Sequence, residues 1–186
     1  MKSLELLMQE HRLIERGLAL LKNIADRLER GESVSIEKVI SLLDFFRVFA
    51  DKCHHIKEEK ALFPKLETRG IPREGGPIGV MLNEHEKGRT LQEQMRQALS
   101  DFLEAKARQN FVSSAREYIT LLSQHIWKED NVLFQMAKQI LNKSDDMELE
   151  KSFESYEQEQ IGGDSHEQYH KLICELEAYF LLHHNN

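Results

Sequence analysis

Apolar residues recur at alternating steps of three and four along this chain, a spacing that predicts amphipathic helices with one buried face. The first such segment runs from about residue 3 to residue 30, and Gly31 is expected to end it. The second begins near Ser35 and should end between residues 68 and 70, before a loop at 70–77 that is rich in glycine and proline. The expected core positions of these two helices are Leu4, Leu7, His11, Ile14, Leu18, Leu21, Ala25 and Leu28, then Ile36, Ile40, Leu43, Phe46, Ala50, His54, Glu58 and Leu62.

Two further helices follow with the same spacing, and a turn is expected between them at about residues 106–110. Their expected core positions are Ile78, Met81, His85, Gly88, Met95, Leu99 and Phe102, then Phe111, Ala115, Tyr118, Leu122, His125, Glu129, Val132 and Met136. Four such helices predict an all-α fold, an up-down-up-down four-helix bundle with a C-terminal helical extension. The bundle is expected to occupy residues 1–142, and the extension, residues 143–186, to pack on it, with Phe153 and Tyr156 as its anchors.

Histidine interrupts the apolar face of every one of the four helices, and glutamate joins it in the second and the fourth. The residues are His11, His54 with Glu58, His85, and His125 with Glu129. In an antiparallel hairpin, residues equally far from the turn lie side by side, and the midpoint between His11 and His54 falls within residues 31–33. The midpoint between His85 and His125 falls at residue 105, close to the second expected turn. The four imidazoles are therefore predicted to lie in one layer of the bundle.

A buried layer of six ionisable side chains is costly unless something binds them. Residues four apart share a helical face, so each His-x-x-x-Glu pair can hold one ion or two neighbouring ions. Imidazole and carboxylate ligands suit iron, zinc or manganese, and no cysteine is expected at the layer as a structural zinc site would require. Six ligands are too many for one tetrahedral ion. The pattern therefore favours a pair of metal ions, with two iron ions first and zinc or manganese as alternatives.

Other polar residues near these positions are candidates for supporting roles around the predicted metal site. His55 is expected to face another side of its helix, as a surface group or one that orients a ligand, and an additional ligand is the remaining alternative. Glu59 and Asp130, like Glu10, Glu15 and Glu84, are expected to be solvated or to orient the histidines. His166 and His170 form an i, i+4 pair in the extension and are weaker candidates for additional ligands.

Composition narrows the function classes further. The chain has 186 residues, a size that suits one domain with a real core. Its net charge of -7 does not favour a nucleic-acid or anionic-membrane partner. Two distant cysteines and the lack of an apolar leader or a long apolar run favour a cytoplasmic protein without disulfides.

The chain resembles the hemerythrin-like family of cation-binding four-helix bundles over roughly residues 1–142. The resemblance rests on four motifs in the family's order: Glu10-His11, His54-His55-Ile56-Lys57-Glu58-Glu59, Glu84-His85-Glu86 and His125-Ile126-Trp127-Lys128-Glu129. It implies that the four histidines are terminal ligands of two irons and that Glu58 and Glu129 bridge them. Oxygen-carrying members hold a fifth histidine on the third helix, where this chain has Met81 and Arg89. That departure argues against reversible oxygen storage.

Three function classes remain open at this point. The first is a non-haem di-iron protein that binds or senses oxygen or nitric oxide, or that handles iron. The second is a di-iron oxidoreductase with ferroxidase, peroxidase-like or nitric oxide-reducing activity at the same centre. The third is a helical interaction module without metal. A binding protein for a diatomic ligand is favoured over a dedicated enzyme, and a protein partner cannot be named.

Overall fold

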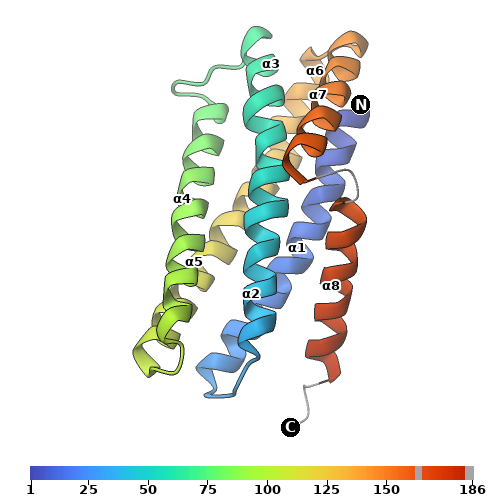
Figure 1. The fold of residues 1–186 in the computed structure, drawn as a ribbon. Coiled ribbons are helices and arrows are strands. Elements are labelled where there is room, and N and C mark those ends of the chain that lie inside the picture. Colours follow the sequence, from blue (N-terminus) through green and yellow to red (C-terminus); the bar gives the residue numbers. More distant parts are fainter. Residues whose placement is uncertain (162–164, 183–186) are drawn as a thin grey trace.

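The computed structural model describes residues 1–161 and 165–182, and all regular structure in them is helical. Figure 1 shows four long segments side by side with short turns at alternate ends, so the predicted all-α bundle is confirmed. The segments are α1 (Lys2–Glu29); α2 (Ile36–Phe45) continuing through η1 (Phe46–His55), η2 (Glu58–Leu62) and α3 (Phe63–Thr68); α4 (Pro77–Ala98) with η3 (Leu99–Asp101); and α5 (Ala105–Lys128) with η4 (Glu129–Leu133) and α6 (Phe134–Ile140). The extension forms α7 (Lys143–Ile161) and α8 (Ser165–Leu182).

Glycines end two of these segments where the sequence placed the breaks. Gly31 and Gly70 have φ angles of 77° and 96°, in the left-handed region that glycine adopts without strain. Each lies inside a helix-ending pair of hydrogen bonds, with Glu32 N donating to the Arg27 carbonyl and Ile71 N to the Leu66 carbonyl, both at 3.0 Å. The second segment begins as expected at Ser35, whose hydroxyl accepts from Lys38 N at 3.4 Å.

The turn between the last two bundle helices differs from the prediction. It lies at residues 102–104, and α5 has already begun at Ala105, whereas the sequence suggested residues 106–110. Helix-compatible residues such as Lys106 and Arg108 extend α5 toward the turn, and Arg108 closes it by donating to the Phe102 and Leu103 carbonyls at 3.1 and 2.7 Å. The shift is small enough to leave His85 and His125 at one level.

Three stretches of π-helix, where hydrogen bonds run from residue i to i+5, change which side chains reach the core. Two of them begin at the glutamates of the metal motifs, Glu58 and Glu129. The stretch that begins at Glu129 shifts the buried face of its helix by one residue, so Leu133 is buried while Val132 is 43% exposed. Val132 and Met136 were therefore wrong as core predictions, as were Ile36 and Ile40, which are exposed near the start of α2.

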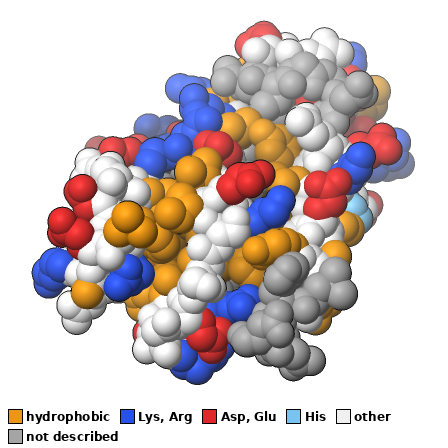
Figure 2. Space-filling view, turned by 60° about the horizontal axis from the view of Figure 1, so that its bottom comes forward, with side chains coloured by type: hydrophobic (Ala, Val, Ile, Leu, Met, Phe, Trp, Pro, Cys, Tyr) orange, Lys and Arg blue, Asp and Glu red, His pale blue; other side chains and the backbone are white. Residues whose placement is uncertain are grey.

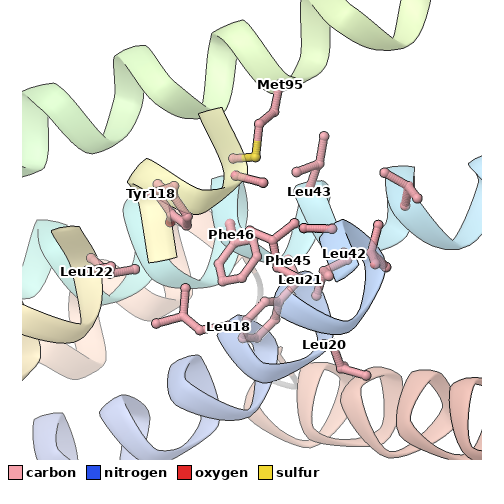
Figure 3. Packing of buried hydrophobic residues seen from close by; sticks show 14 of the residues in the cluster. Leu18, Leu20, Leu21, Leu42, Leu43, Phe45, Phe46, Met95, Tyr118 and Leu122 are labelled. Carbon is pink, nitrogen blue, oxygen red and sulfur yellow. The ribbon is translucent and has the colours of Figure 1, made fainter. Parts of the chain in front are cut away.

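Apolar side chains form two clusters, one at each side of the histidine layer. The larger contains Leu18, Phe45, Phe46, Tyr118 and Leu122, whose packing Figure 3 shows from close by. The smaller lies toward the N-terminus of α1 and is built from Leu4, Leu7, Leu62, Phe63, Ile78, Met81, Leu133 and Phe134. Because both clusters are built from residues of all four segments, they fix the polar residues between them at one height.

The extension contributes to both clusters. Leu149 and Phe153 of α7 are buried in the smaller cluster, and Ile173, Leu176 and Phe180 of α8 are buried in the larger. The predicted anchor Phe153 is 1% exposed, while Tyr156 is only partly buried. Figure 1 shows α8 alongside α1 and α2. The extension thus packs along the bundle on the side of its first two segments.

The surface carries charges of both signs. On the face drawn in Figure 2, Lys and Arg side chains are interspersed with Asp and Glu, and apolar side chains gather between the helices. Within residues 1–161 and 165–182, none of the helices has the length and apolar character needed to cross a membrane.

Candidate metal centre

The layer between the two apolar clusters contains every residue of the predicted ligand set. Its members are His11, His54, Glu58, His85, His125 and Glu129, and each is at most 1% exposed. α1 contributes His11, the second segment His54 and Glu58, α4 His85, and the junction of α5 and η4 the last two. The four histidines, one from each segment, therefore lie at one level of the bundle, as the position of the turns predicted.

The inward-facing atoms of these residues lie close enough to share metal ions. The Nε2 atoms of His11 and His125 lie 3.3 and 3.2 Å from Glu129 Oε2. Glu58 reaches two histidines, with Oε1 3.5 Å from His54 Nε2 and Oε2 3.5 Å from His85 Nε2. Its two oxygens point toward different histidines, which is the geometry of a carboxylate that bridges two ions.

Ligand atoms within 4.8 Å of one another form two groups that share Glu58. The first group is His11, His54, Glu58 and Glu129, and the second is His55, Glu58, His85 and His125. Each group offers enough nitrogen and oxygen ligands for a transition-metal ion. The structure thus brings together two neighbouring candidate metal sites.

His55 is the member that sequence reasoning placed elsewhere. It is 3% exposed, so the surface alternative for this residue was wrong. Its ring stacks on His85 with centroids 3.8 Å apart, and it joins the second group of ligands. The π-helical stretch Phe46–His55 carries it there, because an extra residue per turn lets two consecutive histidines both face the layer.

Every histidine of the layer has a carboxylate at its outer nitrogen, Nδ1. The pairs are His11 with Asp130 at 2.7 Å, His54 with Glu10 at 2.8 Å, His55 with Asp51 at 3.4 Å, His85 with Glu59 at 2.7 Å and His125 with Glu84 at 3.0 Å. An ionised carboxylate only accepts hydrogen bonds, so each Nδ1 carries a proton and Nε2 is the nitrogen that faces the interior, where it can offer its lone pair to a metal ion. This arrangement is typical of metal-binding histidines.

Basic side chains neutralise the outer carboxylates in turn. Arg12 contacts Asp130, Lys57 contacts Glu10, and Lys128 contacts Glu84. Arg89 donates to both remaining ones, from Nε to Asp51 at 2.7 Å and from Nη2 to Glu59 at 2.6 Å. The outer carboxylates can therefore stay ionised although they lie at the edge of the core.

The polar atoms at the centre of the layer lack partners of this kind. Among the described residues, none makes a well-formed hydrogen bond to His11 Nε2, His54 Nε2 or any carboxylate oxygen of Glu58 and Glu129. The Nε2 atoms of His85 and His125 face each other at 3.1 Å. Buried acceptors that face one another are unfavourable unless a cation lies between them. The residues present therefore fit metal ions, and the orphaned atoms are the evidence for it.

The pKa values of the two central glutamates reflect the same crowding. Burial and the neighbouring Glu129 carboxylate raise the pKa of Glu58 well above its usual value. Burial acts in the same sense on Glu129, but attraction to His125 and to His11, whose Nε2 atoms lie 3.2 and 3.3 Å from Glu129 Oε2, outweighs it and lowers the pKa of Glu129. Without cations, the pair is thus favoured with a single negative charge. Bound cations would allow both carboxylates to ionise.

The remaining candidates lie further from the centre. Glu59 and Asp130 orient His85 and His11, whereas Glu15 is exposed and pairs with Arg12 at 3.0 Å. His170 is exposed on α8, within 3.2 Å of Arg16, and does not reach the layer. His166 contacts Glu10 at 2.9 Å but none of the inward-facing ligand atoms.

Sequence reasoning missed Asp51 and the basic residues of the outer shell. Asp51 lies four residues before His55, and Lys57 and Lys128 each immediately precede a central glutamate. The i, i+4 spacing of Asp51 and His55 was a usable signal. Nothing in the sequence indicated that Arg89 would serve two carboxylates.

Fold and site together define a helical bundle with buried histidine and glutamate groups that are candidate cation-binding sites. The family model described as the hemerythrin HHE cation-binding domain matches residues 2–137, and this chain belongs to that family. Curated proteins described as uncharacterized, from Mycobacterium bovis and two strains of Mycobacterium tuberculosis, are each 24% identical over 158 residues. That match covers 84% of this chain but only 61% of each relative. A search of solved structures gave no significant match.

Proposed function

We propose that this protein holds two iron ions and uses them to bind or sense a diatomic ligand, oxygen or nitric oxide, or to handle iron. The observation that carries the proposal is the set of five inward-facing imidazoles around two central carboxylates. His11 and His54 would hold one ion and His55, His85 and His125 the other, with Glu58 and Glu129 between the two. Family membership supports cation binding, and the ligand types support iron.

The two halves of the centre are unequal, and this supports a role in binding small ligands. The second group has three imidazoles, and the first has two. With both glutamates shared, the first ion would have four protein ligands and the second five, so the first would keep more positions for an outside molecule. The apolar clusters on both sides would admit a small neutral molecule more readily than a charged one.

His55 also changes the expectation about oxygen. The argument against reversible storage assumed that no histidine replaces the one missing beside His85, where Met81 and Arg89 stand. His55 brings the number of inward-facing imidazoles to five, although from the second helix instead of the third. We therefore keep reversible oxygen binding within the proposal.

Anaerobic loading with ferrous iron, followed by elemental analysis and optical spectroscopy, tests the proposal. We expect two iron ions per chain and a change in the visible spectrum on exposure to oxygen or nitric oxide. At most one ion per chain in fully loaded protein would contradict the dinuclear centre. Full recovery of the ferrous spectrum after oxygen is removed would identify a reversible binder. Steady consumption of oxygen or nitric oxide would instead favour the oxidoreductase alternative.

A further inference from the structure

Of the five outer carboxylates, Glu10 has contacts that set it apart. Bundle residues provide the basic partners of Asp51, Glu59, Glu84 and Asp130. Glu10 has a bundle partner, Lys57, and in addition a residue of the C-terminal extension, His166. The extension therefore reaches the surroundings of the metal centre at Glu10.

The contacts at Glu10 connect α8 to His54. Glu10 is 1% exposed, and its Oε2 accepts from His54 Nδ1 at 2.8 Å. Its Oε1 is shared by the Lys57 ammonium and by His166 Nε2, which lies 2.9 Å away. Glu157 of α7 lies 3.2 Å from His166 and 3.3 Å from Lys57, so both helices of the extension take part.

The position of His166 is fixed by packing. The His166 ring contacts the Phe49 ring edge-to-face, with centroids 5.3 Å apart. Tyr169, one turn further along α8, packs on the same Phe49 ring, with centroids 5.6 Å apart. A cavity of about 350 Å³, lined by Leu6, Gln9, Leu13 and Phe49 among others, opens beside His166. The imidazole is therefore anchored on one side and accessible to solvent on the other.

The cluster does not suit a third metal ion, although Glu10, Cys53 and His166 are close enough to one another to hold one. The Lys57 ammonium contacts Glu10 and lies 3.4 Å from His166 Nε2, so a positive charge already occupies that place. Hydrogen bonds to Cys53, Glu10 and Glu157 raise the pKa of His166 to about 11. At neutral pH, His166 therefore adds a second positive charge beside Glu10.

We propose that the C-terminal extension tunes the metal centre, with His166 acting through Glu10 as a positioning residue for His54. This inference rests on the proposed metal pair. A carboxylate that accepts from a metal-bound histidine makes that histidine a stronger ligand, and cations on the carboxylate weaken this effect. His166, held in place on α8, therefore weakens the binding of one ion by His11 and His54.

In the test, the full-length chain is titrated with up to two equivalents of Co²⁺. Co²⁺ is the probe because its visible absorption depends on the ligands around each ion. Replacing His166 by glutamine should tighten one of the two ions by about three- to tenfold, less than the roughly 10- to 100-fold effect of removing a ligand's own hydrogen-bond partner. His166→Lys keeps the charge and should retain wild-type affinity. His170→Gln, one turn along α8, is the matched control and should change neither ion.

A double-mutant cycle shows whether the effect passes through Glu10. In the Glu10→Gln background, His166→Gln should change affinity by less than twofold, because the acceptor that transmits its charge is gone. Glu157→Gln should have the opposite effect to His166→Gln and weaken the binding of the same ion. Without the Glu157 carboxylate, the positive charges of Lys57 and His166 are balanced by Glu10 alone. Far-UV circular dichroism establishes that every variant remains helical.

The outcomes separate the two proposals. A wild-type protein that binds fewer than two Co²⁺ ions overturns the proposed function itself. If the wild type binds two and His166→Gln binds them equally well or more weakly, the centre stands and the role of the extension is refuted. An equal effect of His166→Gln with and without Glu10 would also refute it.

Discussion

His55 and His85 stack on each other, with ring centroids 3.8 Å apart and planes 14° from parallel. They come from different helices, and His55 follows directly after His54, which faces the other half of the layer. The contact therefore assigns two neighbouring histidines of one helix to two different ligand groups.

Replacing His55 by alanine should weaken one of two bound ions by at least about tenfold, since even an orienting group of a ligand is worth that much. The ion affected is the one held with His85 and His125. The measurement is a metal titration monitored by absorption, with His170→Ala as the control on an exposed histidine. Unchanged binding of both ions would mean that His55 only packs against His85.

Glu58 and Glu129 are expected to matter for both ions, and Glu59 and Asp130 for one each. Alanine at either central position should reduce occupancy to one ion or none, because a bridge contacts both. Glu59→Gln or Asp130→Asn should cost about 10- to 100-fold in affinity for a single ion. Elemental analysis and titration distinguish these results, with the exposed Glu15→Gln as the control. Equal losses in all four variants would contradict this division of roles.

The six central residues could be predicted because their positions depend on helix periodicity and turn location alone. His11 and His54 lie at equal distances from the Gly31 turn, and no detail of side-chain packing enters that argument. The wrong predictions of buried positions arose where the number of residues per helical turn changes. Val132 and His55 were misplaced because π-helical stretches move the buried face by one residue, and short-range sequence patterns carry no clear mark of them. The basic partners of the carboxylates were missed since they depend on contacts between helices.

Two glycines that follow equivalent Glu-His motifs should respond differently to substitution. A Cβ at Gly17 would lie 2.7 Å from Phe45 Cε1, whereas one at Gly88 would meet Tyr118 Cε2 at an ordinary 3.7 Å. Alanine gains about 1 kcal/mol of helix propensity at either place, but overpacking at Gly17 costs about 1–3 kcal/mol. We expect Gly17→Ala to be less stable than Gly88→Ala by about 1–3 kcal/mol in urea denaturation of metal-free protein. Equal stabilities would show that Phe45 relaxes freely.

Asp146 caps α1 from the extension, and its contribution to stability should depend on pH. Its carboxylate accepts from the backbone N–H groups of Lys2 and Ser3, both at 3.1 Å, and from the Ser3 hydroxyl at 2.5 Å. These are among the first N–H groups of the helix, which have no partner within it. Burial opposes ionisation, but the hydrogen bonds from Ser3 and Lys2 prevail and lower the pKa of Asp146 below its usual 3.8.

The direction of the pH effect follows from that lowered pKa. Since the folded protein binds the proton less readily than the unfolded chain, the stabilisation is complete above about pH 4 and is lost as pH falls through the folded pKa. Asp146→Asn in metal-free protein should cost about 0.5–2 kcal/mol at pH 7, the usual range for a helix cap. The difference from wild type should shrink steadily below about pH 4. Glu154→Gln, on the exposed side of α7, is the control, and a difference that stays constant down to pH 2 would exclude the ionised cap.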